Sequence, residues 1–580
     1  MTDAVTLQII RGKLEALARE MGVVLARSAM SPVIYEVYDF GCGISDAKGR
    51  LIAGSHGVAA FSALFGPQIN AIAAKYGDAM RPGDIYMTND PYLGGSHLND
   101  VLLVVPIFED GRPIAFASSY AHWTEVGGMT PGSLSPNAEE IYQEGIRFPI
   151  MRLYRAGERQ DELLELIAAN VRLPRMSLGD LNAQIAALRI GETRLREAIA
   201  KYGRDQVLAA FDHVLETSER LARAAVAALP DGVYEAEDFI DGDGFSDKQY
   251  PVRMRMTIAG DEIEFDFAGS CGQLRGPMNC SLEMLLCGVK VVFKAIVDPH
   301  GPSNEGWYRP IRVKAPEGCV FNARAPAAMG WFYEPMAQGA ELVWKAMAPL
   351  APERLTAGSY MSICVVLMGA KWPGSREQFV HIEASAGGFG AAEGADGTSV
   401  LPATPQGDLY NYSLEPLEAR APLRMHRYAL NTGDGSGAGR WRGGFGAIRE
   451  YEILGEDAFI YGGMGRNRER PWGMAGGGPG SCNGYEVVRN GTTVRYGRTQ
   501  KGDLAPGDRV RIVTGGGGGF GDPLARPPEA VREDVLDGYI DAEAARADYG
   551  VVMDADGAVD RAATEACRRE RAGADGPSRS

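Results

Sequence analysis

The 580-residue chain lacks an excess of basic charge and lacks long apolar runs. Its 59 basic residues are outnumbered by 75 acidic ones, and the resulting charge of −16 argues against nucleic acid or anionic lipid as a partner. The longest apolar runs, such as VLLVVPIF, are about half of the roughly 20 residues that a membrane-spanning helix needs. We therefore expect a soluble protein that associates with neither nucleic acid nor membrane.

Paired cysteines are also missing. The eight cysteines include no CxxC pair and no secretory segment precedes them, which favours reduced core cysteines in a cytoplasmic protein. The first 30 residues place Leu7, Ile10, Leu14, Leu17 and Met21 at helical spacing. This pattern is typical of an amphipathic helix rather than a signal peptide.

Several catalytic motifs are absent. The sequence contains no GxSxG, no HExxH and no GK[ST], so this chain alone does not resemble a serine hydrolase or a kinase. The segment RVRIVTGGGGGFGDP contains a formal GxGxxG at Gly516, Gly518 and Gly521. A dinucleotide site also needs a helix to begin there, and Pro523 and Pro527 interrupt it. We therefore predict a structural or lid-like glycine loop.

The order of sequence patterns predicts a mixed α and β fold. Strand-like runs separated by turn residues indicate an N-terminal α/β region over 1–159, which carries the candidate site. Ala-, Leu-, Glu- and Arg-rich segments with helical spacing indicate a central helical block over 160–230. A large Gly- and Pro-rich β region over 231–525 follows, then a C-terminal helical segment over 526–556. The polar end, 557–580, is expected to be disordered.

The stretch GGSHLNDVLLVVPIF places His97 and Asp100 at the mouth of an apolar strand, and a second run returns to His122. A three-residue loop in this hairpin would put Asp100 opposite His122, with Cβ atoms about 4.5–5.5 Å apart. A two-residue Asp110-Gly111 turn, which this dipeptide favours, would instead pair Asp100 with Ala121 and turn His122 to the other face. Spacing alone leaves both registers open.

Two neutral imidazoles and one carboxylate form a ligand set that suits Zn, Mn or Fe(II), with positions left for water or substrate. The plainer alternative is that these are unrelated polar residues at strand ends. The sequence pattern by itself does not decide between the two interpretations.

TNDPYLGGSHLNDVLLVVPIF resembles the signature stretch of the hydantoinase B/oxoprolinase family. YDFGCGISDAKGRLIA, GAGRWRGGFGAIREYEIL and DGYIDAEAARADYGVV also resemble recurrent segments of that family, in the expected order over nearly the whole length. In metal-bearing members the ligands are an Asp, a His and Asp, and a later His. The resemblance places these ligands on Asp39, His97, Asp100 and His122.

The resemblance implies a B-type subunit of a hetero-oligomeric, ATP-dependent amidohydrolase. A hydantoinase A-type subunit would bind ATP and Mg and phosphorylate the carbonyl oxygen of a small cyclic amide such as hydantoin, N-methylhydantoin, 5-oxoproline or another lactam. The B-type subunit would complete ring opening. This division is chemically coherent, because phosphorylation activates the poorly electrophilic amide and a metal lowers the pKa of bound water from 15.7 towards about 7.

Further residues near the motif have two interpretations each. Asp90 could orient a ligating imidazole, or it could form an Asx-type turn before Pro91. Trp123 and Glu125 stand where family members often carry a second histidine and an aspartate, so we expect an altered substrate pocket beside the metal. Glu125 could serve as general base or be structural. His56 is expected to be a solvated loop residue.

Two other functions stay open. The resemblance extends to acetone and acetophenone carboxylases, in which a phosphorylated enol attacks CO₂ derived from bicarbonate. Amide hydrolysis is favoured because the length is close to that of hydantoinase B subunits. The chain could also be a non-catalytic scaffold for its ATP-binding partner, and metal content of the purified chain would discriminate this alternative.

Overall fold

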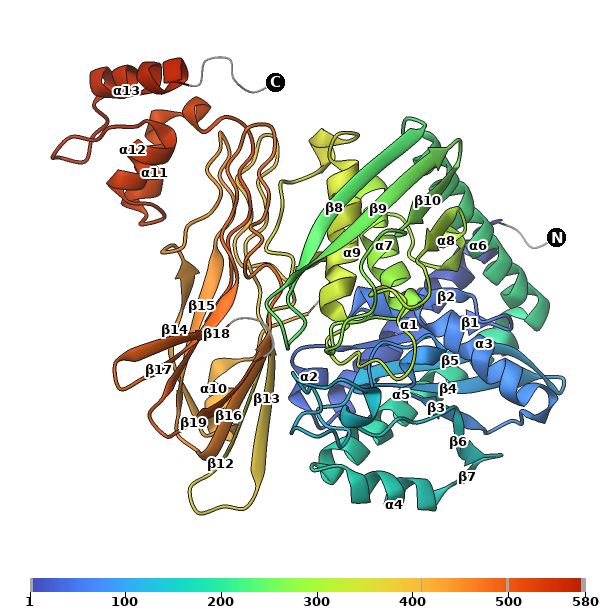
Figure 1. Cartoon of the computed structure of the whole chain (residues 1–580). Coiled ribbons are helices and arrows are strands. Elements are labelled where there is room, and N and C mark those ends of the chain that lie inside the picture. The colour runs from blue at the N-terminus through green and yellow to red at the C-terminus, as the bar shows by residue number, and fades with distance from the viewer. Residues whose placement is uncertain (1–3, 408, 497–499, 575–580) are drawn as a thin grey trace.

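The computed structural model describes residues 4–407, 409–496 and 500–574, and it confirms a mixed α and β fold. Figure 1 shows two bodies that lie side by side, with three C-terminal helices at one end of the second body. The first body contains the elements up to α9 (Tyr333–Met347), and the second consists mainly of strands from β12 (Val365–Lys371) onward. Within these described ranges, no helix is long and apolar enough to cross a membrane.

Seven antiparallel strands form the central sheet of the first body, in the order β2-β1-β5-β4-β3-β6-β7. Both of its faces are covered: Leu103 of β4 packs with α1 (Ala4–Ser28) and α5 (Pro174–Tyr202), whereas Leu102 packs on the other face with α7 (Leu282–Val297). This double burial explains the continuous apolar run of β4. The strands are β1 (Phe40–Asp46), β2 (Leu51–Gly54), β3 (Ile85–Thr88), β4 (Asp100–Glu109), β5 (Arg112–His122), β6 (Met151–Arg155) and β7 (Glu158–Arg159).

The β4–β5 hairpin combines features of both predicted registers. Its turn is the two-residue one, because Glu109 pairs with Arg112 and the φ angles of Asp110 and Gly111 are 48° and 74°. The register then shifts between Ile107 and Phe108, so the second strand carries one extra residue. This β-bulge restores the pairing of Asp100 with His122 that the two-residue turn alone would have lost. The prediction that a two-residue Asp110-Gly111 turn would pair Asp100 with Ala121 is therefore wrong.

Helices and a second sheet complete the first body. The central helical block consists of three helices in succession, as the residue pattern predicted. A four-stranded sheet in the order β11-β10-β9-β8 packs against α7 and α9. The helices are α2 (Pro32–Tyr35), α3 (Phe65–Tyr76), α4 (Asp161–Asn170), α5, α6 (Arg204–Ala227) and α8 (Glu305–Tyr308), and the strands are β8 (Gly232–Asp241), β9 (Gln249–Ala259), β10 (Glu262–Asp266) and β11 (Ile311–Lys314).

The second body contains two sheets that share one hydrophobic cluster. Met368 and Ile460 of the sheet β13-β12-β16-β19 pack with Tyr451 and Ile512 of the sheet β14-β15-β20-β17-β18. The elements are α10 (Leu414–Arg420), β13 (Gln378–Ala384), β14 (Leu423–Asn431), β15 (Gly446–Ile453), β16 (Glu456–Gly463), β17 (Gly484–Arg489), β18 (Thr492–Tyr496), β19 (Gln500–Leu504) and β20 (Arg509–Val513).

The glycine-rich segment after β20 is a packing element. A Cβ atom at Gly518 would lie 2.1 Å from the carbonyl oxygen of Trp472, and one at Gly519 would lie 2.1 Å from that of Ala438. The backbone N–H of Gly518 donates to the carbonyl of Gly358 at 2.8 Å. The segment therefore needs glycine so that neighbouring backbones can approach closely.

The C-terminal helices correct one expectation. They are α11 (Pro528–Leu536), α12 (Ala542–Tyr549) and α13 (Arg561–Ala574). Arg568 of α13 donates from Nε to the carbonyl of Tyr549 at 3.0 Å and from Nη2 to that of Arg526 at 2.8 Å. The prediction of disorder from residue 557 is therefore wrong for α13, whose arginines satisfy backbone carbonyls of the preceding segments. Residues 575–580 lie outside the described residues.

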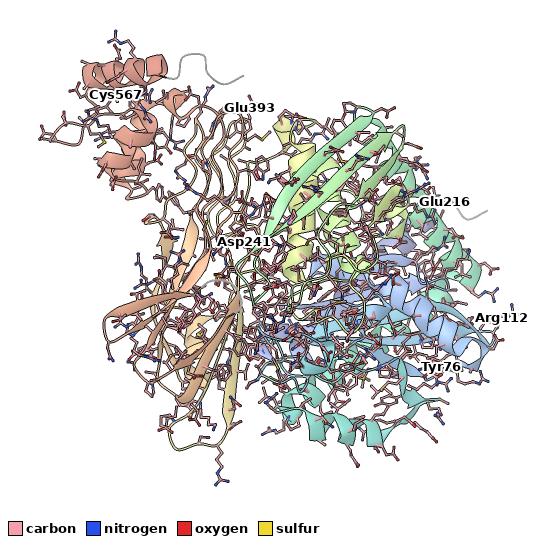
Figure 2. The ribbon with its side chains drawn as sticks, in the orientation of Figure 1. Tyr76, Arg112, Glu216, Asp241, Glu393 and Cys567 are labelled. Carbon is pink, nitrogen blue, oxygen red and sulfur yellow. The ribbon has the colours of Figure 1, made fainter. Side chains whose placement is uncertain are left out.

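Buried carboxylates near the end of β8 join the two bodies. Asp241, labelled in Figure 2 between the bodies, accepts the backbone N–H groups of Asn467 and Arg468 at 3.1 Å each. Asp238 forms a two-point ion pair with Arg466 at 3.1 and 2.7 Å, and both side chains are 1% exposed. Removing one partner of such a buried pair is strongly destabilising. These contacts therefore hold the second body against the first.

Candidate metal centre

Two histidines and one aspartate converge at one end of the central sheet. Asp100 begins β4, His122 ends β5, and the two form a cross-strand pair, while His97 precedes β4 by one short turn. His122 Nδ1 lies 3.1 Å from Asp100 Oδ1 and 3.2 Å from His97 Nε2. His97 Nε2 lies 3.3 Å from Asp100 Oδ2. These three residues, here called the His–Asp cluster, are buried and could hold a metal ion.

The orientation of His97 is set by a distant part of the chain. His97 Nδ1 lies 3.0 Å from the carbonyl oxygen of Gly330, which can only accept a hydrogen bond. Nδ1 therefore carries the proton, and the lone pair of Nε2 points to the His–Asp cluster. The hydroxyl of Ser96 donates to Asp100 Oδ2 at 2.5 Å and orients that carboxylate.

The donor set fits a divalent ion. Nitrogen and oxygen ligands at about 2.0–2.2 Å from a tetrahedral ion lie about 3.3–3.6 Å from one another. The donor separations of 3.1–3.3 Å in the His–Asp cluster are close to that range. In addition, His122 Nε2 is buried and has no hydrogen-bond partner among the described residues. The chemistry of the set suits Zn, Mn or Fe, and it does not distinguish among them.

Asp100 and His122 shift each other's pKa values within the His–Asp cluster. Burial acts to raise the pKa of Asp100, but the imidazoles of His97 and His122 outweigh it and hold this pKa well below its usual range. Burial acts to lower the pKa of His122, but the hydrogen bond to Asp100 and the charges of Asp39 and Asp100 together outweigh it and raise this pKa. The ionised carboxylate is therefore stabilised by the imidazoles beside it.

Asp39, the remaining predicted ligand, lies at the edge of the His–Asp cluster just before β1. Its Oδ2 is 3.9 Å from His122 Nδ1, and its backbone carbonyl accepts the N–H of His122. Burial raises the pKa of Asp39 to about 6, although the imidazole of His122 opposes the shift. Asp39 is thus adjacent to the cluster but outside the tight donor set, and its role as a ligand stays a prediction.

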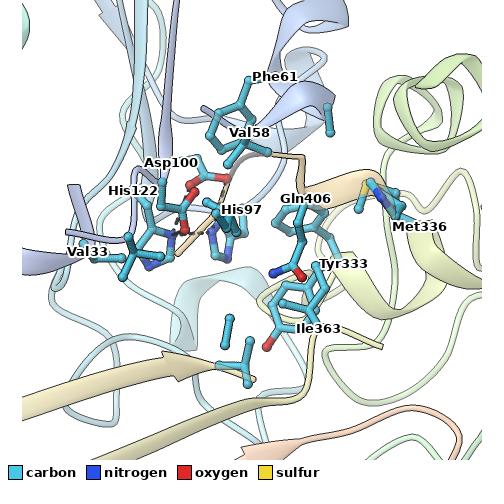
Figure 3. A pocket seen from close by; sticks show the side chains of 18 of the residues that line it. Val33, Val58, Phe61, His97, Asp100, His122, Tyr333, Met336, Ile363 and Gln406 are labelled. Carbon is cyan, nitrogen blue, oxygen red and sulfur yellow. Dashed lines mark hydrogen bonds and ion pairs between the residues drawn. The ribbon is translucent and has the colours of Figure 1, made fainter. Parts of the chain in front are cut away.

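A cavity with a mostly apolar wall opens onto the His–Asp cluster (Figure 3). The space in it that a water-sized sphere can reach is about 70 Å³, and the atom-free space of about 680 Å³ around it includes open solvent. Both bodies contribute to its wall, which also carries the polar side chains Tyr333 and Gln406. The apolar wall includes Val33, Val58, Phe61, Met336, Ile363 and Ile382.

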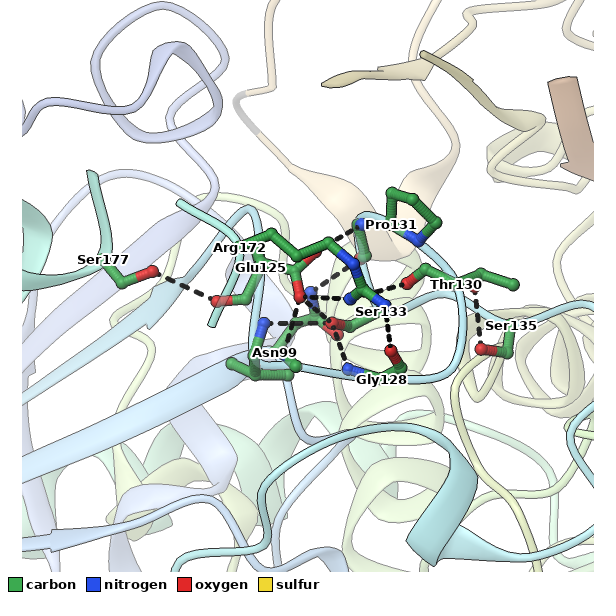
Figure 4. A network of polar contacts seen from close by, with 12 residues as sticks. Asn99, Glu125, Gly128, Thr130, Pro131, Ser133, Ser135, Arg172 and Ser177 are labelled. Atoms are coloured by element: carbon green, nitrogen blue, oxygen red, sulfur yellow. Dashed lines mark hydrogen bonds and ion pairs between the residues drawn. The ribbon is translucent and has the colours of Figure 1, made fainter. Parts of the chain in front are cut away.

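Asp90 and Glu125, the weaker candidates, have other partners. Asp90 Oδ1 accepts the N–H of Tyr92 at 3.1 Å, which is the Asx-type turn that was one of its two interpretations. Glu125 is fully buried, and Oε1 accepts from Gly127 N at 2.7 Å and from Arg172 Nη1 at 2.9 Å (Figure 4). Neither carboxylate lines the cavity of the His–Asp cluster. Their catalytic roles stay predictions, and the geometry favours structural ones.

We expect Glu125→Gln to lower the free energy of unfolding by about 2 kcal/mol or more, because an amide cannot satisfy all the N–H donors that surround this carboxylate. Metal affinity and turnover per folded molecule should stay near wild type. Thermal denaturation and metal titration of the same preparation check this. A loss of turnover above hundredfold with unchanged stability would instead support the general-base role.

The structure also places Trp123 and His56. Trp123 is fully buried, and its Nε1 donates to Gln184 Oε1 of α5 at 3.0 Å. It does not line the cavity, so the expectation of an indole beside the metal is wrong. The reason is strand alternation, which turns the residue after His122 to the opposite face of the sheet. His56 lines a separate hollow together with Lys294.

Sequence reasoning missed the residues that support the site from afar. Gly330 accepts from His97, and Glu144 accepts the N–H of Gly330 at 2.6 Å. A signal for Glu144 was available in its segment, IYQEGIRFP, which also resembles a recurrent segment of the family. No local pattern marked Gly330.

Comparison with known proteins assigns the family. Residues 3–523 match the model of the hydantoinase B/oxoprolinase family, so the chain belongs to that family, as the sequence segments indicated. It is 32% identical to the caprolactamase subunit beta of Pseudomonas jessenii over 577 residues, which covers 98% of this chain and 99% of that protein.

Solved structures agree with this assignment. The crystal structure of the ATP-dependent caprolactamase from Pseudomonas jessenii matches with a TM-score of 0.91 at 31% identity, over 98% of this chain and 100% of that chain. A nucleotide-free structure of acetone carboxylase matches with a TM-score of 0.91 at 21% identity, over 100% of this chain and 84% of that chain. The second likeness shows a shared fold and no more.

Proposed function

We propose that this chain is the B-type subunit of an ATP-dependent amidohydrolase that opens a small cyclic amide. The observation that carries the proposal is the His–Asp cluster, whose three side chains approach one another to 3.1–3.3 Å at the wall of a mostly apolar cavity. His97, Asp100 and His122 would hold a divalent ion there, with Asp39 as a further ligand. The bound ion would supply a water of lowered pKa near neutral pH.

The rest of the cavity suits a lactam or hydantoin ring. Its apolar wall would bury the methylene groups of the ring and exclude bulk water, while Gln406 and Tyr333 offer polar groups for the amide. The hydroxyl of Ser96 orients the Asp100 carboxylate, and the carbonyl of Gly330 keeps the proton of His97 on Nδ1.

Activation of the amide would fall to a partner. The sequence contains no GK[ST] motif, and the similar caprolactamase chain is named a subunit beta. A hydantoinase A-type subunit would bind ATP and Mg and phosphorylate the carbonyl oxygen. The functional unit would then be a hetero-oligomer.

The test is a substrate screen of the complex purified with its A-type subunit. We expect ATP-dependent ring opening of at least one of hydantoin, N-methylhydantoin, 5-oxoproline or another lactam, with ADP released in proportion. The second candidate, a subunit of a ketone carboxylase, is kept because the sequence resemblance extends to acetone and acetophenone carboxylases. Bicarbonate-dependent ATP turnover with a ketone, and no ring opening, would reverse the choice. A complex without bound metal would favour the scaffold alternative.

A further inference from the structure

A buried carboxylate lies behind the His–Asp cluster rather than in it. Glu144 is 1% exposed, and both its oxygens accept backbone hydrogen bonds: Oε2 from Met329 N at 3.0 Å and Oε1 from Gly330 N at 2.6 Å. Burial raises the pKa of Glu144 to about 8, and no lysine or arginine of the described chain forms an ion pair with it. A buried carboxyl group without a cation costs free energy, so its presence calls for a physical reason.

The two amides that Glu144 binds belong to the segment that orients His97. The carbonyl of Gly330 accepts from His97 Nδ1 at 3.0 Å, and the next N–H, that of Trp331, donates to the carbonyl of Pro277 at 3.1 Å. The peptide groups before and after the Cα atom of Gly330 are therefore both fixed by hydrogen bonds. Two residues later, the ring of Phe332 packs edge-on against the His97 imidazole with centroids 4.8 Å apart.

Attachment of this segment does not depend on Glu144. The N–H of Ile141 donates to the carbonyl of Pro326 at 2.8 Å, and the hydroxyl of Tyr92 donates to that of Ala327 at 2.5 Å. These bonds already tie the segment to its neighbours two or more residues before Met329. What Glu144 adds is the orientation of two consecutive peptide groups immediately before the carbonyl that binds His97.

We infer that Glu144 is a positioning residue of the metal centre: by holding the N–H groups of Met329 and Gly330, it aims the Gly330 carbonyl at His97 Nδ1 and so keeps His97 Nε2 directed at the metal position. Direct hydrogen-bond partners of metal ligands, here the Gly330 carbonyl that Glu144 holds, typically contribute about 10–100-fold to metal affinity. The inference rests on the proposed metal site and adds a residue that no ligand motif contains.

The test is metal binding by the full chain without nucleotide or substrate. Glu144→Gln keeps one acceptor oxygen but turns an NH₂ group towards a backbone N–H. We expect Zn²⁺ and Mn²⁺ affinity, measured by competition with a chromophoric chelator, to fall by about 10–100-fold. The visible spectrum of the Co²⁺-loaded protein at saturation should also shift, because the His97 ligand is no longer held in the same orientation.

A matched control exists in α5. Asp180 is fully buried, its Oδ1 accepts the consecutive N–H groups of Met30 and Ser31 at 2.8 and 3.0 Å, and burial raises its pKa. Asp180→Ala, which removes the oxygen that accepts both N–H groups, should lower thermal stability while leaving metal affinity and the Co²⁺ spectrum unchanged. This comparison separates positioning of the metal site from general stabilisation.

A second variant approaches the same contact from the other side. A Cβ atom at Gly330 would lie 2.8 Å from Glu144 Oε1, so Gly330→Ala should displace the carboxylate and weaken metal binding even if Glu144→Gln does not fold. The double variant should lose less metal affinity than the product of the two single-variant losses, because both substitutions disturb the same contact between Glu144 and Gly330.

The outcomes are distinguishable. Wild-type metal affinity in Glu144→Gln or in Gly330→Ala, or an equal loss of metal affinity in Asp180→Ala, would overturn the role of Glu144 while the metal site stands. A wild-type chain that takes up no divalent metal would overturn the proposed function itself and this inference with it.

Discussion

Replacing His97 or His122 with alanine will remove the metal and the ring-opening activity together. Each imidazole supplies one donor atom to a cluster whose side chains approach one another to 3.1–3.3 Å, and no other His, Cys, Asp or Glu among the described residues belongs to that group. Because loss of an outer partner alone typically costs about 10–100-fold, loss of a direct ligand should cost more than about 100-fold in metal affinity. Turnover of the complex should fall to background, as metal analysis and a steady-state assay would show.

These substitutions should leave the fold and the partner complex intact, because they change one side chain at the cavity wall and leave the two large hydrophobic clusters unchanged. His213→Ala is a suitable control. His213 lies on α6, and within the described chain the one hydrogen-bond partner of its ring is Gln8, at 3.5 Å. Asp100→Asn sharpens the test by keeping the size and removing the charge. Full metal occupancy and wild-type turnover in His97→Ala would show that the metal interpretation is wrong.

The isolated chain will neither hydrolyse ATP nor bind it with micromolar affinity, and it will not open a lactam or hydantoin ring. The sequence lacks the lysine-bearing phosphate loop, and its longest glycine run is packed so tightly that a Cβ atom at Gly518 or Gly519 would lie 2.1 Å from neighbouring backbone. A loop in this arrangement has no free N–H cradle for phosphates. Calorimetric titration of the chain with ATP and Mg²⁺ checks the first two statements.

Adding the A-type subunit should restore activity from background to the full rate of the complex. The matched measurement is turnover of the same substrate by each subunit alone and by the two together. Micromolar ATP affinity of this chain alone, or ring opening without a partner, would contradict the division of labour.

The neighbourhood of the site could be predicted because its signals are local. His97 and Asp100 are three residues apart, and the strand-like runs on either side of Asp110-Gly111 indicate a hairpin. The register could not be derived in the same way. One extra residue in β5, beside Pro113, decided that Asp100 faces His122, and a bulge leaves no clear mark in a sequence pattern.

The amino-acid sequence by itself determined the mixed fold, the helical block and the absence of a phosphate loop, because these follow from composition, periodicity and short motifs. The candidate ligands came from the resemblance of its segments to the family. Tertiary structure alone decided the support of the site: Gly330 is 233 residues from His97 and 186 from Glu144, and the cavity wall comes from both bodies. Tertiary structure also turned Trp123 away from the metal position and ordered α13. Such contacts arise when distant segments pack together and satisfy one another's buried polar groups, and no local pattern encodes which segments will meet.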